Sequence, residues 1–123
     1  MGKDIHYSLI SFFEERMKGH DKVESYSRQD DPNDILYTID RTAGLSTLTV
    51  YLSDAYAFTL NDYYSKPEIL QKGDFILVTK PEASYNSAAE DVARIEGIGL
   101  GPIGKLMGAL NKRDVSTYVI PEK

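Results

Sequence analysis

The residues best suited to chemistry stand where an acidic turn leads into an apolar run. Asp30-Asp31-Pro32-Asn33-Asp34 is rich in turn-forming residues, and the β-branched segment 35–40 that follows is typical of a strand. Asp34 therefore lies where turn meets strand. Two roles are open to it: a solvated residue of the turn, or one carboxylate of a metal site.

Mg²⁺-dependent nucleases show what the second role requires. They hold the metal with carboxylates from adjacent strands, and a nearby lysine helps to position or deprotonate water beside the scissile phosphate. An aspartate at the start of one strand, with Glu-x-Lys on the next, would place all three side chains on one face. Asp54, just past the second predicted strand, is a further candidate metal ligand beside Asp34.

The elements that must position these residues form one domain, residues 1–123. The composition is that of a globular protein, with 41% hydrophobic and 27% charged residues. There is no cysteine, which excludes disulfides, thiolate zinc sites and a cysteine nucleophile. No apolar run approaches the length of a membrane span and no signal peptide is visible, so we expect a cytoplasmic location and no membrane contact.

Hydrophobic spacing predicts helices and strands in alternation. A helix is expected over 4–18, with Asp4 as its cap and Gly19 as its end. Two more helices are expected to open with capping boxes, Ser65…Glu68 and Ser87…Glu90. The predicted helices are 4–18, 65–73, 87–96 and 102–110, the last with Pro102 at its first position.

The strands are predicted from alternation and from one continuous apolar run. A short strand is expected at 23–27, and 35–40 with 46–52 read as an antiparallel hairpin. The run 74–80 is typical of a strand buried on both faces. The remaining predicted strands are 55–60, 98–100 and 115–120. This order predicts an α/β fold of two or three layers around a mixed sheet, antiparallel at the start and parallel later.

The whole pattern resembles the restriction-endonuclease-like fold, the PD-(D/E)XK nuclease superfamily, over residues 5–120. Leu9 to Gly19, with Glu14 or Glu15 as the acid, looks like the family's first helix. Pro32-Asn33-Asp34 looks like its Pro-Asp turn with one residue inserted. The segment 74–81, a helix and then Gly97-Ile98-Gly99-Leu100 are similar to the back half of several members.

The resemblance departs from the family at the second strand, which should carry Glu-x-Lys. Thr49 stands at the acid's position and Tyr51 at the lysine's. Threonine is a poor Mg²⁺ ligand, and tyrosine has a pKa near 10. The resemblance therefore implies a nuclease fold with degenerate motif positions, which are Glu14, Glu15, Asp34, Thr49 and Tyr51.

Three functions follow as expectations. The first is a catalytically inactive module without a cofactor, associated with nucleic acid or a protein partner, with a homodimer as one option. The formal charge of −5 disfavours strong non-specific binding to nucleic acid but leaves room for a local basic patch. The second is an active Mg²⁺-dependent nuclease with a relocated site, drawn from Glu14 or Glu15, Asp34, Asp40 or Asp54, with Lys80 as a distant base.

The third expectation is a small-ligand or nucleotide site in the glycine-rich segment 97–104. Gly99 to Gly104 matches G-x-G-x-x-G, a pattern that can cradle a pyrophosphate at a helix N-terminus. The motif lies near the end of the chain rather than after the first strand, which favours tight turns and close packing instead.

Tyrosines near the second predicted strand are a last feature of the sequence. Exposed aromatic side chains can stack on bases or fill protein interfaces, whereas tyrosine is also common in ordinary strands. The residues concerned are Tyr51, Tyr56, Tyr63 and Tyr64.

Overall fold

The computed structural model describes residues 5, 7–30, 34–42, 44–55, 57–79 and 84–117. The strands of its main sheet are β1 (Val23–Arg28), β2 (Ile35–Arg41), β3 (Leu48–Ser53), β5 (Phe75–Val78) and β7 (Gly99–Gly101). A two-stranded sheet consists of β4 (Ala57–Phe58) and β6 (Ser84–Tyr85). The helices are α1 (Tyr7–Lys18), α2 (Leu60–Tyr64), α3 (Ser87–Glu96) and α4 (Ile103–Ala109), followed by a 3₁₀ turn, Val115–Thr117.

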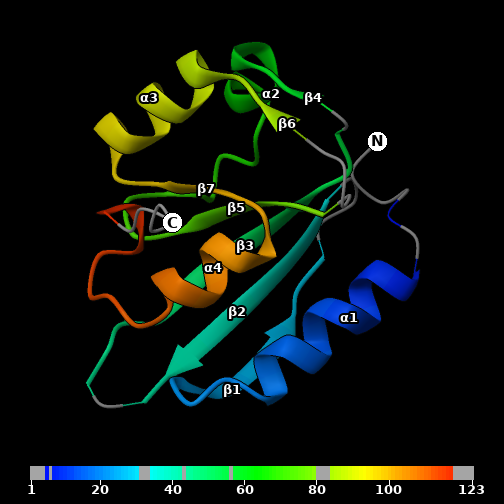
Figure 1. The fold of residues 1–123 in the computed structure, drawn as a ribbon, viewed down its shortest axis with the longest axis vertical. Helices are drawn as coiled ribbons and strands as arrows, with labels where there is room; N and C mark the ends of the chain where they lie inside the picture. The colour runs from blue at the N-terminus through cyan, green and yellow to red at the C-terminus, as the bar shows by residue number, and fades with distance from the viewer. Residues whose placement is uncertain are drawn as a thin grey trace, which may run out of the picture.

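The main sheet is mixed, as predicted. Its strand order is β1-β2-β3-β5-β7, with antiparallel pairing from β1 to β3 and parallel pairing from β3 to β7. Helices α1 and α4 cover one face, and α2 and α3 lie on the other (Figure 1). The fold is therefore an α/β arrangement of three layers, one of the two arrangements expected from the sequence.

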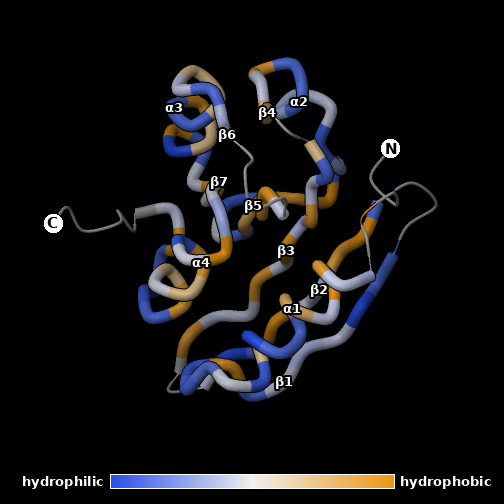
Figure 2. The backbone as a smooth tube through the Cα atoms, turned by 45° about the vertical axis from the view of Figure 1, so that its right-hand side comes forward, coloured by the Kyte–Doolittle hydropathy of each residue, from blue (hydrophilic) through white to orange (hydrophobic). Residues whose placement is uncertain are grey.

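Each face of the sheet carries its own apolar core. Side chains alternate along β2 and β3, and the predicted apolar faces do pack under α1 and α4: Ile35, Tyr37, Ile39, Leu48, Val50 and Leu52. Leu36 and Ile76 point to the other face, under α2 and α3. All four residues of β5 are buried, which explains its uninterrupted apolar sequence. Figure 2 shows hydrophobic residues concentrated on these central strands.

The segment after β3 differs from the prediction. Instead of a strand over 55–60 and a helix over 65–73, the chain forms the two-residue β4 and then α2. Thr59 opens α2 with a capping box completed by Asp62, and Ser65 is its C-cap rather than an N-cap. The helix cannot continue easily because Pro67 disfavours helical geometry at the residue before it.

The ends of the later elements also shift. Asn86, not Ser87, caps α3, and Gly97 ends it as predicted, with φ 77°. Pro102 is the N-cap of α4 rather than its first residue. The predicted strand 115–120 is wrong over 115–117, where Asp114 accepts hydrogen bonds from the Ser116 backbone and hydroxyl and favours a turn. Residues 118–120, like the predicted cap at position 4, lie outside the described residues.

Two long-range polar contacts fix α4 against the start of the chain. The Nδ1 of His20 faces the Lys22 N–H and must accept from it, so Nε2 carries the hydrogen and donates to the Met107 carbonyl at 2.7 Å. The Arg41 guanidinium, 6% exposed, donates to the carbonyls of Leu110 (3.1 Å) and Lys112 (2.7 Å) beyond the end of α4. The described part of the chain contains no helix of the length and apolar character that a membrane crossing requires.

Candidate functional site

The candidate site lies where β2 begins and β3 ends. Asp34 directly precedes β2, and the register sets Leu36 opposite Tyr51. Because β3 and β5 are parallel, the carboxyl ends of both strands lie together on this side of the sheet. Crevices beyond the carboxyl ends of parallel strands are the usual place for ligands in α/β sheets.

Tyr51 is the centre of this region. Burial raises the pKa of its phenol well above the ordinary value, and the negative charges of Asp34, Asp54 and Asp62 raise it further. Asp34 has the largest effect of the three acids on the pKa of the phenol. The Tyr51 hydroxyl therefore stays un-ionised at neutral pH, and toward an ionised carboxylate it can only donate.

The three aspartates come from three different segments. Asp34 opens β2, Asp54 follows β3, and Asp62 lies in the first turn of α2. Asp62 already has a structural role, because its Oδ2 accepts from the Thr59 N–H and hydroxyl, each at 2.9 Å. Carboxylates are the ligands that Mg²⁺ prefers. Among residues 5, 7–30, 34–42, 44–55, 57–79 and 84–117, however, no three acidic, histidine or cysteine residues form a metal-binding group.

Thr49, the other degenerate motif position on β3, is held in place through its backbone N–H. Its N–H donates to Oδ1 of the buried Asp74 at 2.8 Å, and the Gln71 N–H donates to Oδ2 at 2.9 Å. Burial raises the pKa of Asp74, whereas these two backbone hydrogen bonds act in the opposite direction. Asp74 therefore ties the starts of β3 and β5 together, a role that its place before an apolar strand did not reveal.

The acids of the first helix lie away from Asp34. Glu14 accepts a hydrogen bond from the Tyr37 hydroxyl, and Tyr37 belongs to the core under α1 and α4. Glu15 is exposed. The structure thus places Glu14 on the opposite side of the sheet from the Tyr51 ring, which packs with the core under α2 and α3.

The other candidates for a relocated site are also dispersed. Asp40 accepts from the hydroxyls of Ser25 (3.1 Å) and Thr47 (3.0 Å) near the far end of β2. Asp40 lies six positions after Asp34 along the strand, a distance of about 20 Å. Lys80 lies outside the described residues. Of the candidate ligands, Asp34 and Asp54 are the two whose charges act on Tyr51.

Gly99 and Gly101 of segment 97–104 make close packing contacts, whereas a Cβ at Gly104 would have no atom within 4 Å. A Cβ at Gly99 would lie 2.4 Å from the Phe75 ring, and one at Gly101 would lie 2.6 Å from the Lys105 side chain. Lys105, 8% exposed, continues past Gly101 to an ion pair of 3.0 Å with Glu90. Gly99 and Gly101 therefore have a packing role in the fold.

The tyrosines do not share one exposed face. Tyr63 is buried, donates to Glu96 and has the Lys66 ammonium 4.1 Å from its ring centre. Tyr64 is 64% exposed, whereas Tyr51 is half-buried. Tyr56 lies outside the described residues.

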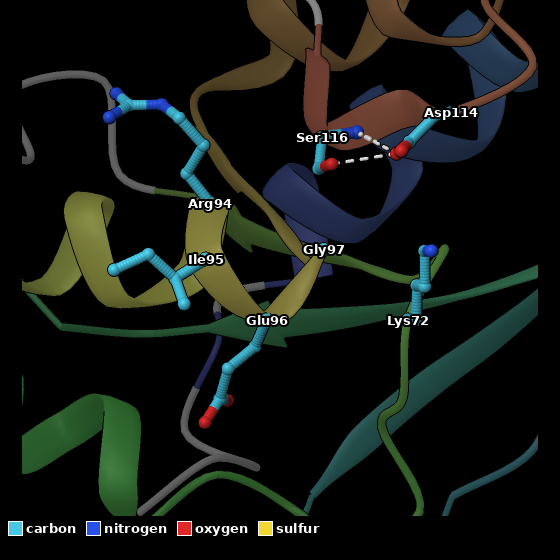
Figure 3. A pocket seen from close by; sticks show the side chains of 7 residues that line it. All are labelled: Lys72, Arg94, Ile95, Glu96, Gly97, Asp114 and Ser116. Atoms are coloured by element: carbon cyan, nitrogen blue, oxygen red, sulfur yellow. Dashed lines mark hydrogen bonds between the residues drawn. The ribbon is translucent and has the colours of Figure 1, made fainter.

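An open hollow of about 470 Å³ lies at the opposite, amino end of the parallel strands. It is lined by Lys72, Arg94, Ile95, Glu96, Gly97, Asp114 and Ser116. Figure 3 shows Arg94 and Glu96 pointing away from Lys72, while Asp114 and Ser116 bond to one another. Its charges are thus mixed and do not converge on one point.

Comparisons with protein-family models, with curated proteins and with solved structures found no match to this chain.

Proposed function

We propose that this chain is a restriction-endonuclease-like domain without a complete catalytic set, which serves as a binding or structural module beside nucleic acid. The order of the elements supports this proposal. One helix precedes an antiparallel meander of three strands, and a helical segment then leads to a strand parallel to the third. This is the order expected from the sequence resemblance.

The observation that carries the proposal is the electrostatic interaction between Asp34 and Tyr51. Asp34 matches the family's first acid in the sequence resemblance, and the next strand supplies a phenol where the family has a lysine. A phenol never carries the positive charge of a lysine. Because burial raises the pKa of Tyr51 above the ordinary value, its hydroxyl stays un-ionised and does not deprotonate water at neutral pH.

The charge at this edge directs how the module would meet nucleic acid. Asp34, Asp54 and Asp62 give the region negative potential, which repels phosphate groups. Direct contact with a DNA or RNA backbone is therefore expected elsewhere on the molecule or through a partner protein. A labelled duplex followed by fluorescence anisotropy at about 50 mM salt tests this contact, because phosphate binding is strongest at low salt.

The second candidate function, an Mg²⁺-dependent nuclease with a relocated site, is favoured by one observation. The negative charges of Asp34 and Asp54 both act on the hydroxyl of Tyr51, and carboxylates are the ligands that Mg²⁺ prefers. A metal bound there would be held by these two residues and would supply charge for phosphate chemistry.

Isothermal titration with Mn²⁺, together with cleavage of supercoiled plasmid, separates the two functions. For the inactive module we expect neither saturable Mn²⁺ binding nor cleavage. Saturable binding that is lost in Asp34→Ala, with cleavage lost in parallel, would instead establish the relocated site.

A gain-of-function variant tests the assigned positions directly. Thr49→Glu combined with Tyr51→Lys restores the family's acid and lysine on one face of β3. We expect this variant to bind Mn²⁺ and to lose that binding when Asp34→Ala is added. Thr47→Glu with Tyr64→Lys, at two exposed positions, is the matched control and should bind no Mn²⁺. A folded double variant without Mn²⁺ affinity would contradict the assignment.

A further inference from the structure

Strand β1 forms one border of the main sheet, with β2 on its inner side only. The Gln29 N–H donates to the Leu36 carbonyl at 2.7 Å and continues the β1–β2 ladder by one step. Backbone groups alternate in direction along an antiparallel pair, so those of Arg28 and Tyr26 point away from β2. Within the described part of the chain, they meet no other backbone.

This border is polar and accessible. Glu24, Ser25, Ser27 and Arg28 are exposed, while the Tyr26 ring leans on Tyr37 with 6.1 Å between ring centres. Figure 2 shows β1 mainly in the colours of hydrophilic residues, unlike the central strands. Charges on an edge strand usually prevent non-specific pairing, and they permit pairing only where opposite charges meet.

The charges around Tyr26 have a particular order. Lys22 and Glu24 precede it by four and two residues, and Arg28 and Asp30 follow it by two and four. These four charges are therefore opposite in sign at equal distances on either side of the tyrosine. Within one chain, Arg28 also forms an ion pair with Asp30, with 2.9 Å between Nη2 and Oδ2. A strand with this pattern is complementary to itself when two copies run antiparallel about a two-fold axis.

We propose that β1 pairs with β1 of a second copy of this chain, antiparallel and centred on Tyr26. The facing residues would be Tyr26 with Tyr26, Ser25 with Ser27, and Glu24 with Arg28, all within β1. The outward backbone groups of Tyr26 and Arg28 would complete their hydrogen bonds across the axis, and the two sheets would become one.

Neighbouring registers are unfavourable for the same charges. Centring the pair on Ser25 would set Glu24 against Tyr26, and centring it on Ser27 would set Arg28 against Tyr26, so either shift loses both Glu24–Arg28 pairs. Opposite charges directly across from each other stabilise a strand pair. The bulge between Val23 and Ser25 also bends the border near Glu24, which limits regular pairing to about five residues on each chain. The second copy is thus selected by charge and confined to one register.

Charge-reversing substitutions in the full chain test this dimer. The dimer does not depend on the proposed function. At about 100 µM protein, sedimentation velocity should show a dimer for the unaltered chain, since so small an interface requires a high concentration. Glu24→Arg alone and Arg28→Glu alone each set like charges against each other twice, by symmetry. Each should weaken the dimer about tenfold or more and sediment as a monomer.

Mixing the two single variants in equal amounts gives the decisive result. Every facing pair between the two different chains is then of opposite charge, so a heterodimer should form although neither variant pairs with itself. The double variant Glu24→Arg/Arg28→Glu should likewise recover the dimer. Lys112→Glu changes the net charge as Arg28→Glu does, at an exposed position outside β1, and should leave the dimer intact.

Three results would overturn the proposal. They are a monomeric unaltered chain at this concentration, a dimer that survives both single reversals, and a mixture that stays monomeric. Circular dichroism of each variant confirms that a lost dimer does not reflect unfolding.

Discussion

The two ends of strand β2 carry charged groups of opposite sign, and the surroundings of these two groups differ. At one end, Arg41 is buried and donates to carbonyls of the chain beyond α4 and to the Ser46 carbonyl at 2.7 Å. At the other, the negative charges of Asp34 and two further aspartates act on the hydroxyl of Tyr51. The Arg41 end distributes one positive charge over several acceptors, whereas the Asp34 end brings several negative charges to one region. The first arrangement stabilises the fold, whereas the second raises the pKa of a half-buried phenol.

The largest effect on stability is expected when the hydrogen bonds of Arg41 are removed. Burial lowers the pKa of Arg41, but its hydrogen bonds keep the guanidinium in place. Arg41→Met should lower the free energy of unfolding by about 3 kcal/mol or more, because it leaves the buried Leu110 carbonyl and several partly buried carbonyls without their donor. Urea denaturation measures the change. The matched variant Arg94→Met, at an exposed position, should cost less than about 0.5 kcal/mol; equal losses would show that Arg41 has no special role.

A smaller loss of stability is expected when Asp74 is replaced. Asp74→Asn replaces one of two acceptors with a donor, so the free energy of unfolding should fall by about 1–2 kcal/mol. The pKa of Asp74 is raised on folding, so its own contribution is greatest below the ordinary value of 3.8 and declines as the pH rises above it. The difference between the two proteins should therefore be larger near about pH 4 than near pH 7. A difference that grows with pH would contradict this sign.

Asp34→Asn should change stability by less than about 1 kcal/mol, the smallest of the three substitutions. It removes one of several neighbouring negative charges while leaving an oxygen to accept from Tyr51. Thermal unfolding at neutral pH measures it. A loss as large as that of Arg41→Met would show that the Asp34 end also serves mainly to stabilise the fold.

Alkaline titration sharpens the comparison without a loss of structure at neutral pH. Burial, with nearby carboxylates, raises the pKa of Tyr37, Tyr51 and Tyr63. The unfolded chain therefore ionises first, and stability should decline as the pH rises through about 10. Tyr51→Phe should show a shallower decline. Tyrosinate absorbance should rise in two stages, with the buried phenols last; a single stage would contradict these shifts.

Local sequence patterns predicted most of the fold. The features that were missed leave no periodic or local pattern in the sequence. Strand β5 and helix α3 were predictable because an apolar run and a C-terminal glycine act over a few residues. Helix α2 has only five residues, too few for periodicity, and its Thr59…Asp62 box was its only signal. Arg41 carries no local sign at all, since Leu110, an acceptor, lies 69 residues further along the chain. Asp34 and Tyr51 were predicted as one face, while the position of Glu14 depended on how α1 packs.

The partly buried ion pair between Lys105 and Glu90 bears on how copies of the chain would assemble. Lys105 belongs to α4 and Glu90 to α3, so their bond joins the two outer layers around β7, the last strand of the sheet. Side chains of the same chain therefore cross the β7 edge of the sheet, while β1 remains open at the other edge. A sheet with one available border can add one copy and no more, so pairing would end in a closed point-group symmetry instead of a growing fibre.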